Sequence, residues 1–147
     1  HTHQTWATAL NMLENNRLIF ASQTSAYFHG SVAYDDTYNG GADTFEEGER
    51  LGNSVGNAHT LFMKNHGVLV VGDYIAQAFK RLYMLERVCR TQLLAMSSGE
   101  RLTPISEDVI AGMKTPSEHD AHKGERTRLY FDAMKRVLDR EMPGYEQ

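Results

Sequence analysis

The sequence predicts an α/β fold, in which short strands alternate with amphipathic helices in one domain. Two apolar runs, 61–64 and 68–71, have the length of strands, and the second is β-branched and nearly continuous, as in a strand covered on both faces. The following residues, 73–96, keep an apolar stripe at helical spacing until Ser97-Ser98-Gly99. The 147 residues contain no internal repeat or low-complexity segment, which fits one domain.

The first third of the chain is predicted to contain one helix and two strands. Residues 6–13 place apolar side chains at helical spacing, with Thr2 or Thr5 positioned to cap the helix and Asn15-Asn16 to stop it. Residues 18–21 form a short apolar run that predicts a strand, and 31–34 form another after the His29-Gly30 turn.

The remaining elements are predicted to be one loop and three helices. Residues 35–43 contain Gly40-Gly41 and predict a loop, after which Thr44 and Glu47 have capping-box spacing at the start of a helix. Ser106 is placed to cap a helix over 107–114. A polar helix is then predicted from Pro116-Ser117 to about Met142.

Composition and charge exclude several classes of function. Fifteen Lys and Arg residues against nineteen Asp and Glu give a formal charge of -4, so neither nucleic acid nor an anionic membrane is an expected partner. No apolar run approaches the roughly 18 residues of a membrane-spanning helix, and the opening residues lack the pattern of a signal peptide. The single cysteine, Cys89, cannot form an internal disulfide and lies on the apolar stripe. We therefore expect a cytoplasmic protein with a packed, inert thiol.

Three of the seven histidines are candidates for a metal site, although by themselves histidines are more often exposed or satisfied in the core. In an extended segment His1 and His3 point to the same side, which gives two imidazoles on one face. His66 lies between the two strand-like runs, and Gly67 after it allows close approach of backbone or ligand. Three neutral imidazoles with an open position form the arrangement of a catalytic zinc rather than a structural one. His119 and His122, in a uniformly polar stretch, are predicted to be solvent-exposed.

The order of these motifs resembles the class II aldolase/adducin family over about residues 1–99. The similar segments are His1-Thr2-His3, 7–10, 27–34, 46–51, 64–72 and 85–90. An Asn-His-Gly sequence after a strand, with a His-x-His pair about 60 residues upstream, is more specific than either motif alone.

The resemblance implies a single three-layer α/β/α domain with a mostly antiparallel central sheet. It also implies zinc held by His1, His3 and His66, where the metal stabilises an enediolate formed as a carbon–carbon bond breaks. The implied function is a lyase-like enzyme of carbohydrate metabolism that acts on a small hydroxy-carbonyl compound, a sugar or sugar phosphate, by aldol cleavage, epimerisation or decarboxylation. The implied assembly is a homotetramer with active sites between subunits.

Other features of the family are not found in this sequence. The loops that hold the substrate phosphate, and the acidic residue that acts as base or extra ligand, precede the His-x-His pair in the family. The chain opens on His1 rather than Met, so we expect the domain over 1–147 to be incomplete at its N-terminus, and no catalytic base is assigned.

Five polar residues outside the histidine trio are weaker candidates for the site. Tyr27 and Tyr34 are expected in the core or an interface rather than as proton donors. Gln23 and His29 are candidates to line the cleft, and Tyr145 lies in a tail that either frays or reaches a neighbouring subunit.

Two other functions remain open. One is a non-catalytic interaction module of the adducin type, which the presence of all three ligand positions disfavours. The other is an oxygenase that holds ferrous iron, because imidazole ligands suit Fe²⁺ and other divalent metals as well as zinc.

Overall fold

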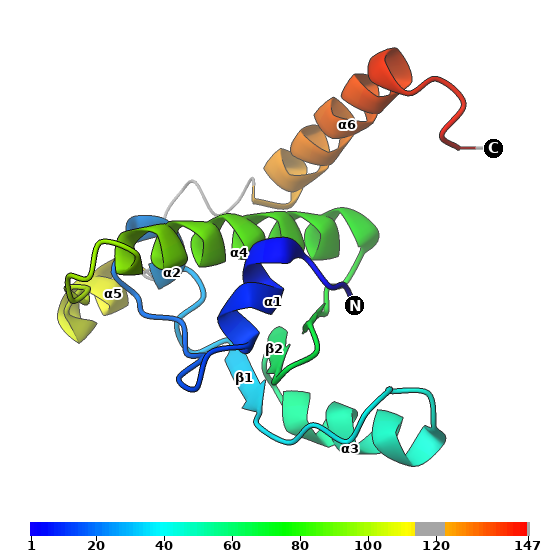
Figure 1. Ribbon diagram of the computed structural model, residues 1–147. Coiled ribbons are helices and arrows are strands. Elements are labelled where there is room, and N and C mark those ends of the chain that lie inside the picture. The colour runs from blue at the N-terminus through cyan, green and yellow to red at the C-terminus, as the bar shows by residue number, and fades with distance from the viewer. Residues whose placement is uncertain (114–122, 147) are drawn as a thin grey trace.

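The computed structural model describes residues 1–113 and 123–146, and helices lie on both sides of a small sheet (Figure 1). This is the mixed α/β fold that the sequence predicts. In chain order the elements are α1 (Thr5–Asn11), α2 (Gln23–Ala26), β1 (Val32–Asp35), α3 (Phe45–Val55), β2 (Thr60–Met63), β3 (Val68–Val70), α4 (Ile75–Met96), α5 (Glu107–Met113) and α6 (Lys123–Glu141).

The sheet has the strand order β1-β2-β3. β1 pairs with β2 in parallel, with Val32 opposite Thr60, and β2 pairs with β3 antiparallel, with Phe62 opposite Val68. Thr2 adds an isolated antiparallel bridge to Val68. Only one of the two strand pairs among the described residues is antiparallel, so the mostly antiparallel, three-layer arrangement expected from the resemblance is not confirmed.

β2 separates two apolar clusters because alternate side chains of a strand point to opposite faces. Phe62 packs into the larger cluster with side chains of α1 and α4, while Leu61 and Met63 pack with Leu51 of α3. Accordingly, α1 and α4 lie on one side of the strands and α3 on the other (Figure 1). The buried members of the larger cluster are Ala7, Leu10, Leu18, Phe28, Phe62, Val68, Leu85, Val88 and Cys89.

The strand predicted over 18–21 is not formed, and this segment is irregular. Side chains take the place of a neighbouring strand, because the Leu18 N–H donates to the Tyr34 hydroxyl at 2.9 Å and the Ile19 N–H donates to Gln92 Oε1 at 2.8 Å. Buried backbone groups need such partners, but sequence alone does not show which side chains supply them.

The sequence predicts the N-cap of α3 correctly and the N-cap of α1 incorrectly. Thr44 caps α3 by accepting from the Glu47 N–H at 3.2 Å, as its spacing predicts. The prediction that Thr2 or Thr5 caps α1 is wrong, since the N-cap is Gln4 and its side chain makes no capping bond. The short α2, which the sequence analysis missed, begins at a capping box of Ser22 and Ser25. The start of the polar helix predicted after Pro116 lies outside the described residues.

Cys89 lies in the larger cluster, fully buried on α4. Burial raises the pKa of its thiol to about 12, so the side chain stays protonated near neutral pH. The prediction of a packed thiol is confirmed, and its raised pKa supports the prediction that it is unreactive.

A membrane-spanning segment is not found among the helices of the described residues, since none combines the required length with enough apolar character.

Candidate metal centre

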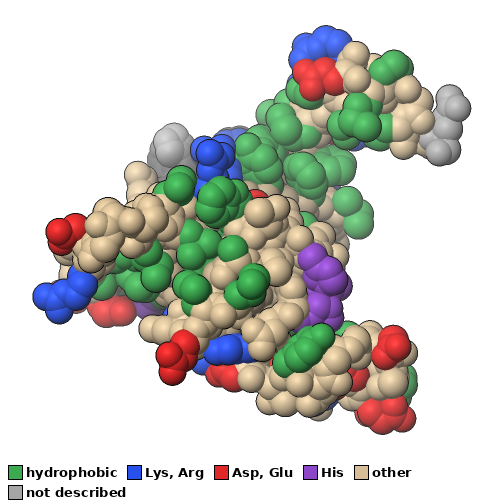
Figure 2. Space-filling view, viewed as in Figure 1, with side chains coloured by type: hydrophobic (Ala, Val, Ile, Leu, Met, Phe, Trp, Pro, Cys, Tyr) green, Lys and Arg blue, Asp and Glu red, His purple; other side chains and the backbone are tan. Residues whose placement is uncertain are grey.

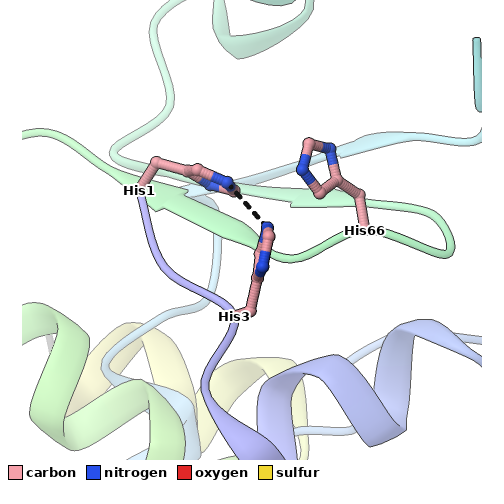
Figure 3. Close-up of side chains that lie close together, drawn as sticks. All are labelled: His1, His3 and His66. Carbon is pink, nitrogen blue, oxygen red and sulfur yellow. Dashed lines mark hydrogen bonds between the residues drawn. The ribbon is translucent and has the colours of Figure 1, made fainter. Parts of the chain in front are cut away.

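The three histidines singled out by the sequence converge at one place on the surface. Each offers a ring nitrogen, and these atoms all lie within 4.8 Å of one another. Figure 3 shows the rings of His1, His3 and His66 pointing toward one another. His1 and His3 are exposed and His66 is half-buried, so a small molecule has access to the cluster.

The Thr2 bridge explains why the first two histidines face the same way. The Thr2 N–H donates to the Val68 carbonyl at 3.0 Å, and the Val68 N–H donates back to the Thr2 carbonyl at 3.0 Å. This pairing holds the opening residues extended beside β3, so residues 1 and 3 point to the same side. His66 reaches the same point from the turn between β2 and β3.

Hydrogen bonding prepares His1 to donate a lone pair. Its Nδ1 lies 3.0 Å from the Val68 carbonyl oxygen, which can only accept, so Nδ1 carries the proton and Nε2 presents its lone pair to the hydrogen bond with His3. That Nε2 lies 3.1 Å from His3 Nε2 (Figure 3). Two nitrogen ligands of one tetrahedral zinc, each at its usual bond length, lie about 3.3 Å apart. The donor chemistry of the three rings and the spacing of His1 and His3 therefore fit a divalent metal.

Gly67 is required by close packing around the cluster. A Cβ at this buried position would lie 2.5 Å from the Thr2 carbonyl oxygen, 2.6 Å from His3 Cδ2 and 3.1 Å from His1 Cε1. The absence of a side chain thus lets the start of β3 lie directly against the His-x-His segment.

Buried amides fix the turn that carries His66. Asn11 Nδ2 donates to the Gly67 carbonyl at 2.7 Å, and Asn16 Nδ2 donates to Asn11 Oδ1 at 3.1 Å. Asn65 adopts a positive φ of 56° and its N–H donates to the Asn11 carbonyl. From sequence, Asn16 is predicted only as a helix stop, because the pattern of apolar residues does not distinguish a buried amide from an exposed one.

Glu86 supplies the cap that α1 lacks in its own sequence. The Trp6 and Ala7 N–H groups donate to Glu86 Oε1 and Oε2, each at 2.9 Å. A carboxylate at a helix N-terminus satisfies unpaired N–H groups and opposes the positive end of the helix dipole. Since α1 begins two residues after His3, this contact from α4 also fixes where the His-x-His segment enters the helix.

A charged network holds α3 beside the histidines. Arg50 donates to both oxygens of the buried Asp35, at 2.8 and 2.7 Å, and to both oxygens of Glu47, at 2.9 and 2.6 Å. In the loop between β1 and α3, the Tyr38 ring lies 6.3 Å from the His66 ring. The network therefore ties α3 to the end of β1. The loop that follows this end of β1 is the one that brings Tyr38 near His66.

Arg50 also sets the protonation of Glu47. Its hydrogen bonds hold the pKa of Glu47 below the ordinary value of 4.5. Because the folded-state pKa is lowered, Glu47 stabilises the fold above about pH 4.5, and this contribution is lost as pH falls through the lowered value.

We therefore expect Glu47→Gln to lower the free energy of unfolding at neutral pH, with a difference from the parent that shrinks below about pH 4.5. Urea unfolding between about pH 3 and pH 7 measures this difference. The exposed Glu14 is a matched control, and its glutamine variant should show a smaller dependence. If Glu47→Gln and the parent differed by the same free energy of unfolding at about pH 3 and at about pH 7, the lowered pKa of Glu47 would be contradicted.

The weaker candidates lie elsewhere. Tyr34 is a core residue, since its ring stacks on Phe62 at 5.5 Å and burial raises the pKa of its hydroxyl. His29 Nε2 lies 3.1 Å from a Glu107 carboxylate oxygen.

The structure does not bring the other candidates into the histidine cluster. Tyr27 and Gln23 are exposed on or next to α2, and Tyr145 lies in the turn after α6. His119 and His122 lie outside the described residues. Within the described residues, the only group of three or more potential metal ligands is His1, His3 and His66.

Comparison with known proteins shows the family to which the chain belongs. The Class II Aldolase and Adducin N-terminal domain matches residues 1–93. A Pseudomonas aeruginosa protein whose name places it in aldolase class 2 is 32% identical over 149 aligned residues, which cover all of this chain and 57% of that relative. The chain therefore spans little more than half the length of this relative.

Two solved structures are also similar. An aldolase II superfamily protein from Pseudomonas syringae is 31% identical, with a TM-score of 0.83 over all of this chain and 58% of that one. An L-fuculose 1-phosphate aldolase from Glaciozyma antarctica is 25% identical, with a TM-score of 0.74 over 96% of this chain and 52% of that one. The domain match covers residues 1–93, including all three histidines. This chain belongs to the class II aldolase/adducin family.

Proposed function

We propose that this chain forms the metal-binding part of a class II aldolase domain with lyase-like activity. Its substrate would be a small hydroxy-carbonyl compound, such as a sugar or sugar phosphate, and its reaction an aldol cleavage, epimerisation or decarboxylation. The observation that supports this proposal is the convergence of His1, His3 and His66, with the lone pair of His1 Nε2 directed into the cluster because Nδ1 bonds to Val68. As the resemblance implies, we also propose a homotetramer.

The residues present fit a divalent metal such as Zn²⁺. Imidazole nitrogens from His1, His3 and His66 would hold it, and when bound it would polarise a substrate oxygen as a Lewis acid. The chain's own part is to fix the three rings. The Val68 carbonyl sets the tautomer of His1, Asn11 holds the turn that carries His66, and Glu86 holds the helix that follows His3.

Elemental analysis of the purified protein tests the proposal. We expect about one metal ion per chain in the parent protein and loss of that metal in His66→Ala. His59→Ala is the matched control, because His59 is an exposed histidine outside the cluster, and this variant should retain the metal. The metal-loaded protein would then be assayed with hydroxy-carbonyl substrates, including L-fuculose 1-phosphate, by mass spectrometry of the products. A parent protein without metal would contradict the proposal.

The same measurement separates two alternatives. The family includes adducins, so a folded protein without metal supports an interaction module. Bound iron together with oxygen uptake supports an oxygenase, because the three imidazoles also suit Fe²⁺.

A further inference from the structure

An apolar cavity of about 400 Å³ adjoins the histidine cluster. His1 forms part of its wall, and the other described residues that line it are all apolar or glycine, among them Leu51 of α3 and Leu69 of β3. In Figure 2 a group of histidine side chains lies at the surface directly beside the lobe that carries α3. A volume of this size is within the range of small-molecule sites, about 300–1,000 Å³.

Two glycines of α3 line this cavity without a structural reason to be glycine. Gly48 and Gly52 lie one helical turn apart, and a Cβ built at either position would meet nothing within 4 Å. Neither has a positive φ. Glycine inside a helix is destabilising relative to alanine, yet packing and backbone conformation do not require it here. A side chain at either position would therefore project into open space at the cavity wall.

His1 connects the cavity to the candidate metal centre. Its Nε2 belongs to the histidine cluster while its ring forms part of the cavity wall. α3 is tied to the end of β1 by the bonds of Arg50 to Asp35, and its Leu51 packs against Leu61 and Met63 of β2, so α3 is fixed to the sheet beside the cavity. A ligand bound at the three histidines would therefore have an apolar space next to it.

We propose that this cavity is a subsite for an apolar substituent of the ligand held at the three histidines. The substrate class is then a hydroxy-carbonyl or 2-hydroxy acid compound with an aliphatic or aromatic group of several carbons. This inference rests on the proposed metal site, and it goes further by assigning α3 the role of selecting the substituent.

Calorimetry with 2-hydroxy acids of increasing length tests the subsite. Glycolate, 2-hydroxybutyrate and 2-hydroxyhexanoate offer zinc-loaded protein the same two oxygens, and each buried methylene should improve the dissociation constant by about fourfold. We expect Gly52→Leu, which fills the cavity, to bring the glycolate-to-hydroxyhexanoate ratio of dissociation constants toward one. Gly112→Leu in α5 is the matched control, since its Cβ also meets nothing within 4 Å, and it should keep the parent ratio. If the parent and Gly52→Leu gave the same ratio of dissociation constants for glycolate and 2-hydroxyhexanoate, the proposed subsite would be overturned.

A second measurement does not depend on metal. In metal-free protein, adding hexanol should shift the methyl NMR signals of Leu51 and Leu69, and Gly52→Leu should abolish these shifts. Gly52→Ala should also raise the melting temperature, because alanine favours the helix. If the purified protein held no metal and hexanol still shifted these signals, the proposed function would be contradicted. The cavity would then still be a binding site for apolar groups. Absence of the shifts, or a dimer that Gly52→Leu converts to monomer, would overturn the subsite.

Discussion

Replacing Gly67 by alanine is expected to weaken metal binding by about 10- to 100-fold. The added Cβ would lie 2.5 Å from the Thr2 carbonyl oxygen and 2.6 Å from His3 Cδ2, so the backbone carrying two of the three histidines must move. The same overpacking should lower the free energy of unfolding by about 1–3 kcal/mol. Competition with a chromogenic chelator measures the metal affinity, and urea unfolding of the metal-free protein measures the stability.

Gly112→Ala is the control for this change. Gly112 lies in α5, and its added Cβ meets nothing within 4 Å, so metal affinity should be unchanged and stability equal or slightly higher. A Gly67→Ala protein with the parent's metal affinity would show that the His-x-His segment adjusts to a side chain. That result would contradict the proposed rigid contact.

Glu86→Ala is expected to lower the free energy of unfolding by about 2–3 kcal/mol. The change removes two hydrogen bonds from a carboxylate to the N–H groups of Trp6 and Ala7, and Ala7 is fully buried. Because no side chain of the local sequence caps α1, there is no local replacement. Metal affinity should fall as well, since the helix that follows His3 is released. Urea unfolding and chelator competition measure the two effects.

Two further variants separate the hydrogen bonds from general loss of charge. Glu86→Gln keeps one acceptor oxygen, so its stability should lie between those of the parent and Glu86→Ala. Glu14→Ala removes an exposed carboxylate just beyond α1 and should change stability by less than about 0.5 kcal/mol. Equal stabilities of Glu14→Ala and Glu86→Ala would refute the capping role.

The convergence of the histidines could be expected from sequence because it depends on local rules. The two-residue spacing of His1 and His3 places them on one face of any extended segment, and the glycine after His66 indicates close approach. Thr44 likewise predicts the start of α3, because its hydroxyl caps a nearby N–H. Local spacing does not bring His66 to His1 and His3. That the three imidazoles meet at one site is instead what the family resemblance implies.

The residues that support the cluster could not be predicted, because each acts through a distant partner. Glu86 caps a helix 80 residues earlier in the chain, and Asn11 binds a carbonyl 56 residues later. For the same reason the apolar segment 18–21 is not a strand, since Tyr34 and Gln92 bind its N–H groups. The apolar cavity depends on how α3 lies against the sheet, and periodicity does not specify that position.

The Glu86 contact has a consequence for the order of events during synthesis. The backbone N–H groups of Trp6 and Ala7 have no local acceptor, so α1 completes its hydrogen bonding only after α4 has been made and has folded against it. His1 and His3 are thus translated well before the carboxylate that caps the helix that follows them. A nascent chain that is stalled before residue 86 should therefore lack a formed histidine cluster.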